Sequence, residues 1–176
     1  MSKATQDERE FIPINIAVLT ISDSRTMEND TSGDILAQRI QDAGHQVAER
    51  EICKDDIYKI RAIVSQWFIN QNVHAIITTG GTGITGQDGT PEAILPILDK
   101  VIDGFGEMFR SLSFQNIHTS SLQSRALAGV ANGTFIFCLP GSNGACKDGW
   151  DLLISYQLDY RTLPCNLVEL MPRLQE

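Results

Sequence analysis

The stretch AIITTGGTGITGQDGTPE, which spans Ala75 to Glu92, carries the most information about the fold. Its first five residues form an apolar, β-branched run typical of a buried strand, and five glycines then fall between Gly80 and Gly89. Glycine lets backbone N–H groups approach a ligand and accepts a positive φ, so a loop of this kind after a strand can hold phosphate oxygens. A plain surface turn needs only one or two glycines. We therefore interpret residues 80–89 as a ligand-binding loop.

The loop differs from two well-known phosphate-binding motifs. A Walker loop needs Lys and then Ser or Thr after its last glycine, whereas Gln87 and Asp88 follow Gly86 here, which excludes that motif. The sequence from Gly81 to Gly86 matches the GxGxxG dinucleotide fingerprint literally, but the fingerprint normally follows the first strand and opens directly into a helix. Here the loop follows about the third predicted strand, and a helix start is predicted only at Thr90-Pro91. A Rossmann-type nucleotide-binding oxidoreductase is therefore a remote alternative, which flavin or nicotinamide titration would test.

Composition limits the class of protein. The chain has 176 residues, 42% of them hydrophobic, which is enough for one domain with a full core. Its net charge of −8 argues against a nucleic-acid partner, and no apolar run is long enough to span a membrane. The four cysteines are scattered and the three histidines have no ligand spacing, so reduced thiols of a cytoplasmic protein are expected. We predict a flexible tail over residues 1–10, which is unlike a signal peptide, and a single domain over residues 11–176.

Strand-like and helix-like periodicities alternate along the first hundred residues. Ile14–Ile21 is almost continuously apolar, as in a strand buried on both faces. A helix is predicted from a cap in Thr31–Asp34 to Gly44, and a second helix is predicted to follow a cap at Asp55. Further strands are predicted at residues 46–52 and 74–79, and a further helix at residues 91–98. This alternation indicates a parallel sheet covered by helices.

The later part of the chain departs from this rhythm. Asn132-Gly133 separates two apolar runs, Ala126–Ala131 and Thr134–Leu139, and is a strong signal for a two-residue hairpin. A helix start is predicted at residues 104–110, a short helix or turn at 120–125, and a helix at 145–158. The sequence therefore predicts an α/β three-layer sandwich, with a mostly parallel sheet, helices on both faces and an antiparallel edge hairpin.

Each unusual loop follows a predicted strand; these loops are residues 22–25, 54–56, 80–89 and 139–142. In open parallel sheets, ligands bind beyond the carboxyl ends of the strands where the strand order reverses, so the loops line one crevice if the first and third strands are neighbours. Carboxylates beside a phosphate site repel the ligand unless a hard cation lies between them, which implies Mg²⁺. Simpler explanations exist for Asp55 as a helix cap and for Asp88 as a turn residue.

Several motifs, in their order and spacing, resemble those of the molybdopterin-binding domain family, and together they cover the chain from about Ile14 to Pro164. They are TTGGTG at 78–83, Asp88 with TPEA at 90–93, SDS at 22–24, D-x-SG at 30–33, GFGE at 104–107, Ser124-Arg125 and LPG at 139–141. After the glycine loop, the chain is similar to the B-type branch of this family.

The resemblance implies the fold of that family and adenylyltransferase chemistry, in which ATP and molybdopterin give adenylylated molybdopterin and pyrophosphate. Active relatives use two aspartates, which correspond here to Asp55, with Asp56 adjacent, and Asp88; both are expected to be catalytic and to hold Mg²⁺. With a net charge of −8, local donors must gather the anionic substrates, and Arg25 is a further candidate cation. The residues expected to bind substrate or phosphate are Ser22, Thr79, Gly80, Gly81, Thr82, Gly83, Arg125, Pro140, Gly141 and Ser142.

Two further expectations concern turnover and assembly. Adenylyltransferases of the family commonly carry a second proline soon after Pro-Gly, but this chain reads PGSNGAC from Pro140, so a non-catalytic molybdopterin-binding or scaffold protein of the same pathway is the competing hypothesis. The resemblance implies trimers, and hexamers of paired trimers in the B-type branch. Apolar side chains that one core does not absorb usually mark an interface. We predict a hexamer, with a trimer second and other cofactor-assembly proteins as possible partners; the aromatic candidates for the interface are Trp67, Phe68, Trp150 and Tyr156.

Overall fold

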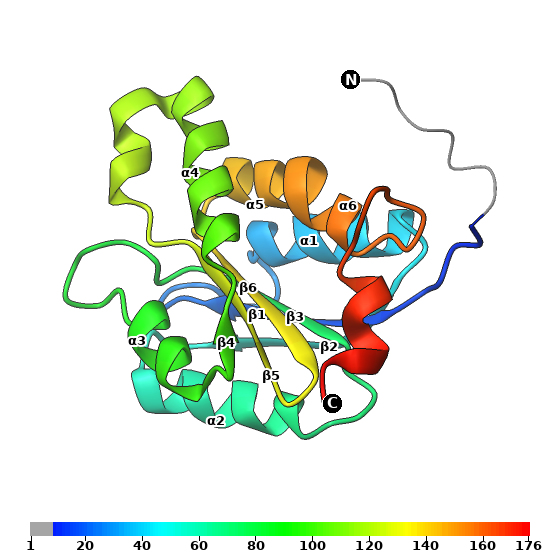
Figure 1. Ribbon diagram of the computed structural model, residues 1–176. Coiled ribbons are helices and arrows are strands. Elements are labelled where there is room, and N and C mark those ends of the chain that lie inside the picture. The colour runs from blue at the N-terminus through cyan, green and yellow to red at the C-terminus, as the bar shows by residue number, and fades with distance from the viewer. Residues whose placement is uncertain (1–8) are drawn as a thin grey trace.

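A six-stranded sheet lies at the centre of the structure, a computed structural model that describes residues 9–176 (Figure 1). Its strand order is β2 (Gln46–Cys53), β1 (Asn15–Ile21), β3 (Ala75–Thr79), β6 (Thr134–Leu139), β5 (Leu127–Ala131) and β4 (Lys100–Val101). The first four strands are parallel, and β5 and β4 are antiparallel to their neighbours. The predicted parallel sheet with an antiparallel edge hairpin is confirmed. The hairpin turns at Asn132 and Gly133, whose φ angles of 47° and 79° suit a two-residue turn.

Helices cover both faces of the sheet, as predicted (Figure 1). One face carries α1 (Thr31–Asp42), α4 (Asp103–Ile117), α5 (Asn143–Gly149) and α6 (Ser155–Gln157), and the other carries α2 (Ile57–Phe68) and α3 (Thr90–Ile94). Side chains of β1 alternate between two apolar clusters: Ile16 and Val18 pack beneath α1, whereas Ala17 and Leu19 pack beneath α2. This double burial is the physical reason for the continuous apolar run in the sequence.

Several helices differ in length or type from the predicted ones. The helix predicted over 91–98 ends at Ile94 and continues as the 3₁₀ turn η1 (Leu95–Ile97), in which Pro96 has no N–H to donate. Residues 145–158 divide into α5, the π-helical turn η3 (Trp150–Ile154) and α6. The 3₁₀ segments η2 (His118–Gln123) and η4 (Val168–Arg173) complete the structure.

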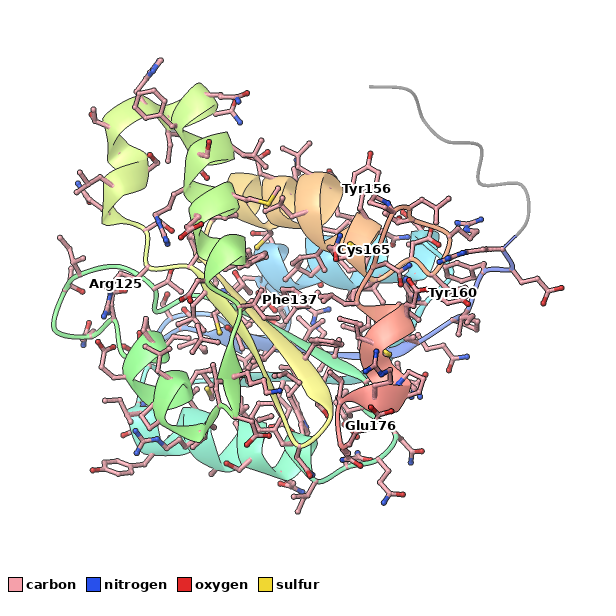
Figure 2. The ribbon with its side chains drawn as sticks, in the orientation of Figure 1. Arg125, Phe137, Tyr156, Tyr160, Cys165 and Glu176 are labelled. Atoms are coloured by element: carbon pink, nitrogen blue, oxygen red, sulfur yellow. The ribbon has the colours of Figure 1, made fainter. Side chains whose placement is uncertain are left out.

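The predicted surplus of aromatic surface is wrong for three of the four side chains. Trp67, Phe68 and Trp150 are 4%, 6% and 3% exposed, because their helix faces pack onto the sheet. Tyr156 remains 52% exposed, on α6 (Figure 2).

The predicted tail over residues 1–10 falls mostly outside the described residues, which begin at Arg9. Arg9 donates a hydrogen bond to the carbonyl oxygen of Tyr160 at 3.3 Å and forms an ion pair with Glu169 at 3.4 Å. The division into a tail and one domain stays a prediction. Within residues 9–176, no helix is both long and apolar enough to cross a membrane.

Candidate functional site

A pocket of about 760 Å³ opens beyond the carboxyl ends of β1 and β3. These strands are neighbours, and the strand order reverses between them because β2 lies on the far side of β1. Parallel α/β sheets bind ligands at this kind of position. Ten of the twelve sequence-predicted site residues line the pocket: Ser22, Asp55, Gly80, Gly81, Thr82, Gly83, Asp88, Pro140, Gly141 and Ser142.

The glycine loop begins with a backbone shape that strongly favours glycine. Gly80 and Gly81 have φ angles of 110° and 65°, and a Cβ on Gly80 would lie 2.1 Å from the carbonyl oxygen of Ile21. Thr90 holds the loop from α3, because its backbone N–H and its hydroxyl donate to the carbonyl oxygens of Gly81 and Gly80. No acceptor among residues 9–176 takes the backbone N–H of Gly81 or Thr82. The floor of the pocket is therefore fixed and presents free donors for an anion.

Asp55 is a pocket residue, and the predicted helix cap at this position is wrong. The cap of α2 is Asp56, whose carboxylate accepts from the backbone N–H groups of Tyr58 and Lys59 at 3.0 and 2.9 Å. Asp55 Oδ1 accepts instead from the backbone N–H of Gly89, at the end of the glycine loop, at 3.0 Å. No donor among the described residues bonds Asp55 Oδ2. One carboxylate oxygen is thus available to a ligand.

Asp88 is held by its own loop. Its Oδ2 accepts from the backbone N–H and the hydroxyl of Thr85, at 2.8 and 2.7 Å. These hydrogen bonds, with the positive charge of Arg125 as a smaller cause, lower the pKa of Asp88. The carboxylate is therefore ionised at neutral pH, and its orientation depends on the shape of the loop.

The charges in the pocket suit a divalent cation. Burial raises the pKa of Asp55, and the negative charges of Asp88 and Asp23 raise it further. A hard cation such as Mg²⁺ would relieve this repulsion, and Mg²⁺ is typically bound by one or two carboxylates together with substrate phosphates. In residues 9–176, no group of three or more His, Cys, Asp or Glu side chains is arranged to hold a metal. Asp55 and Asp88 therefore fit Mg²⁺ that is shared with a phosphorylated substrate, rather than a cage built by protein alone.

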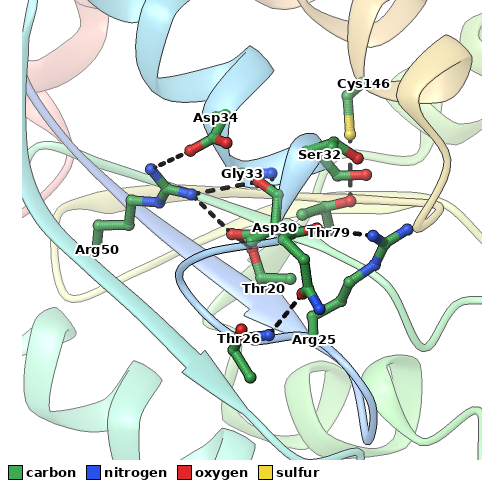
Figure 3. Close-up of polar contacts among 12 residues, drawn as sticks. Thr20, Arg25, Thr26, Asp30, Ser32, Gly33, Asp34, Arg50, Thr79 and Cys146 are labelled. Atoms are coloured by element: carbon green, nitrogen blue, oxygen red, sulfur yellow. Dashed lines mark hydrogen bonds and ion pairs between the residues drawn. The ribbon is translucent and has the colours of Figure 1, made fainter.

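A buried hydrogen-bond network joins β1 to the start of α1, beside the pocket (Figure 3). Asp30 is fully buried and accepts from Thr20 Oγ1 at 2.8 Å, from Gly33 N–H at 3.0 Å and from Arg50 at 2.9 Å. It is the cap of α1, one residue before the predicted Thr31–Asp34 segment. The hydroxyl of Ser32 in the same helix donates to Asn143 Oδ1 at 3.0 Å, beside the loop that follows β6. The network therefore ties the β1 and β6 loops together.

Two predicted site residues lie outside the pocket lining. The hydroxyl of Thr79 is buried and donates to the carbonyl oxygen of Pro140 at 3.1 Å, so this side chain joins two strand ends. Arg125 donates to the backbone of the glycine loop and forms an ion pair with Glu92. Arg25 donates to the carbonyl oxygen of Asn29 at 2.7 Å and borders only a small neighbouring cleft.

Sequence reasoning missed the wall that faces the glycine loop. It comes from α4, η2 and α5 and includes Phe109, Ser113, Asn116, Ser120, Gln123 and Asp148. In the sequence these residues belong to ordinary amphipathic or polar segments, so no local pattern marked them. Asp23, in the SDS motif, also lines the pocket and accepts from Asp55 N–H at 3.3 Å.

Comparison with known proteins gives a consistent result. Residues 17–160 match the family described as "Probable molybdopterin binding domain". Molybdenum cofactor biosynthesis protein B of Escherichia coli (strain K12) is 52% identical over 162 residues, covering 92% of this chain and 95% of that protein.

Solved structures show the same similarity. A crystal structure of a molybdenum cofactor biosynthesis protein B aligns with a TM-score of 0.83 and 40% identity, covering 85% of this chain and 94% of that chain. The tungsten cofactor synthesizing protein MoaB from Pyrococcus furiosus aligns with a TM-score of 0.72 and 31% identity, covering 80% and 90% of the two chains.

Proposed function

Because the chain belongs to the molybdopterin-binding domain family, we propose that it acts in molybdenum cofactor biosynthesis by binding molybdopterin and catalysing its Mg-ATP-dependent adenylylation. The observation that carries this proposal is the pairing of free loop amides with the carboxylates of Asp55 and Asp88 in the lining of one pocket. Asp56 caps α2, so Asp55 is left facing that pocket beside Asp88. A pocket that only held a phosphorylated pterin would gain nothing from these negative charges in its lining.

The reaction would be an in-line displacement. A phosphate oxygen of molybdopterin attacks the α-phosphorus of ATP, a new P–O–P linkage forms, the bond to the β-phosphate breaks, and pyrophosphate leaves. The backbone N–H groups of Gly81 and Thr82 would hold phosphate oxygens in the reacting geometry, so positioning and electrostatics supply the rate enhancement. Asp55 and Asp88 would hold Mg²⁺, which when bound neutralises charge on the triphosphate. No covalent intermediate with the protein is needed.

The proposal is tested with purified protein, Mg-ATP and molybdopterin, by following pyrophosphate release and the adenylylated pterin over time. Asp88→Asn keeps the size of the side chain but removes its charge, so turnover should fall by orders of magnitude. The melting temperature should fall only slightly, because the lowered pKa of this exposed-loop carboxylate makes its ionised form mildly stabilising. Asp42→Asn, which removes a carboxylate at the C-terminal end of α1 outside the pocket lining, is the matched control. An Asp88→Asn variant that turns over at the parent rate would exclude a catalytic metal site at Asp88.

The same experiment separates catalysis from simple binding. A non-catalytic molybdopterin-binding or scaffold protein would bind the pterin, as measured by calorimetry, but would release no pyrophosphate above a protein-free blank. That result would replace the adenylyltransferase proposal with the scaffold function.

We also propose a cytoplasmic homo-oligomer, a hexamer of paired trimers with a trimer as the second choice. The resemblance to the B-type branch supports it, and so do apolar side chains on α4 and η2: Met108, Phe114, Ile117 and Leu122 are 57%, 51%, 52% and 82% exposed. The four cysteines are free, in keeping with a reducing compartment. A monomer mass by light scattering at micromolar concentration would contradict the oligomer.

A further inference from the structure

We propose that Arg125 is a positioning residue that closes the glycine loop and thereby sets the orientation of Asp88, and that it does not bind the anionic substrate. The consequence for catalysis rests on the adenylyltransferase proposal, whereas the effect on the loop does not. Figure 2 shows Arg125 beside the extended loop between β3 and α3.

Arg125 contacts both ends of the exposed part of the loop. Its backbone N–H donates to the carbonyl oxygen of Thr82 at 2.9 Å, and its Nε donates to that of Gly83 at 2.6 Å. One terminal nitrogen donates to the carbonyl oxygen of Asp88 at 2.7 Å. The other terminal nitrogen pairs with Glu92 in α3. One planar guanidinium therefore joins the start of the loop, its end and the helix that follows.

The same contacts leave Arg125 poorly suited to an incoming anion. All three guanidinium nitrogens already have acceptors, and Glu92 offsets the positive charge. Arg125 is absent from the lining of the 760 Å³ pocket and instead lines a smaller neighbouring cleft, which shares Thr85 and Asp88 with that pocket. An anion would have to displace Glu92 and two carbonyl oxygens before it could accept hydrogen bonds from the guanidinium.

Closure of the loop matters because the carboxylate of Asp88 is supported by the loop itself, through Thr85 and the backbone of Gly83. Residues 84–87 are exposed, and the donors to Asp88 Oδ2 come from Thr85 within this segment. A Cβ on Gly83 would lie 2.6 Å from Asp88 Oδ2, so the two ends of the segment are in close contact. If the ends separate, the segment loses the geometry that aims Asp88 into the pocket.

Hydrogen–deuterium exchange of the ligand-free protein tests the clamp directly. Arg125→Lys keeps the positive charge but loses the planar set of guanidinium donors. Hydrogen–deuterium exchange in peptides covering residues 80–90 should accelerate about tenfold or more, because charge-assisted hydrogen bonds to both loop ends are lost. Arg61→Lys is the matched control, because Arg61 makes a similar fork to the carbonyl oxygens of Ala93 and Glu92 but does not contact the loop. Loop exchange equal to that of the parent protein would overturn the clamp.

A second measurement separates positioning from direct binding. In Arg125→Lys, calorimetric affinity for molybdopterin should change less than about threefold, whereas kcat for adenylylation should fall at least tenfold with little change in KM for the pterin. Loss of pterin affinity with unchanged loop exchange would make Arg125 a ligand residue and refute the proposal.

If the parent protein shows no turnover, the adenylyltransferase proposal fails alone, and the exchange comparison still decides the role of Arg125. If Arg125→Lys does not fold, Glu92→Gln is a milder variant, because it removes only the ion pair. It should accelerate hydrogen–deuterium exchange in the loop by less than about tenfold. No acceleration at all would overturn the clamp.

Discussion

Two adjacent aspartates, Asp55 and Asp56, should have opposite effects when substituted. Asp56→Ala removes the cap of α2, in which one carboxylate accepts from two backbone N–H groups at 3.0 and 2.9 Å. Loss of such a cap costs about 1 kcal/mol of unfolding free energy, within a range of about 0.5–2 kcal/mol. For a chain of this size, that cost lowers the melting temperature by about 2–4 °C. Turnover should stay within about twofold of the parent, because Asp56 is exposed and is absent from the pocket lining.

Asp55→Asn should behave in the opposite way. Burial and the charges of neighbouring carboxylates raise the pKa of Asp55 in the folded protein. A carboxyl group whose pKa is raised by folding binds protons more tightly in the folded state, so its contribution to stability is lost as the pH rises through that pKa. At neutral pH the ionised Asp55 is therefore unfavourable, and Asn should leave the melting temperature equal or higher. Turnover should fall by orders of magnitude, because the charge that would hold Mg²⁺ is gone.

The assay pairs thermal unfolding, followed by circular dichroism, with pyrophosphate release under identical buffer conditions. Addition of Mg-ATP should raise the melting temperature of the parent and of Asp56→Ala more than that of Asp55→Asn, because a ligand that binds the folded state stabilises it more the tighter it binds. The reasoning fails if Asp56→Ala loses as much turnover as Asp55→Asn, or if Asp55→Asn unfolds at a clearly lower temperature than Asp56→Ala.

Further predictions concern the loop floor and pH. Gly80→Ala should lower the free energy of unfolding in urea by at least about 2–3 kcal/mol, because its Cβ would lie 2.1 Å from the Ile21 carbonyl oxygen at a φ of 110°. In the control Gly86→Ala, the new Cβ would have no atom within 4 Å, and the free energy of unfolding should change by less than about 0.5 kcal/mol. Equal losses in the two variants would contradict this account. His45 is buried, accepts from Ile14 N–H through Nδ1 at 3.2 Å, and has a pKa lowered by burial. The neutral imidazole therefore contributes its full stabilisation above about pH 6.5, and this stabilisation is lost as the pH falls toward the lower pKa of the folded state. The urea midpoint of His45→Gln should consequently depend less on pH than that of the parent between about pH 7.5 and 5.5.

The sequence by itself determined the elements and much of the pocket. A strand buried on both faces needs a continuous apolar run, as in Ile16–Ile21, and a two-residue hairpin needs residues that accept positive φ, as Asn132 and Gly133 do. Gly80 and Gly81, directly after β3, likewise have positive φ angles that favour glycine. These signals are local, so they survive without knowledge of the fold, and the loops that follow the strands line the pocket because parallel strands end at one edge.

The tertiary structure alone decided how neighbouring side chains are used. Asp56 adopts an extended backbone, with φ −132° and ψ 119°, that directs its carboxylate to the first turn of α2, and Asp55 is thereby turned into the pocket. Two adjacent aspartates before a helix look equivalent in sequence. Arg125 contacts a loop more than thirty residues earlier in the chain, and α4 and η2 reach the pocket only because α4 packs on the sheet. Partners of this kind depend on the path of the whole chain, which no short-range pattern encodes.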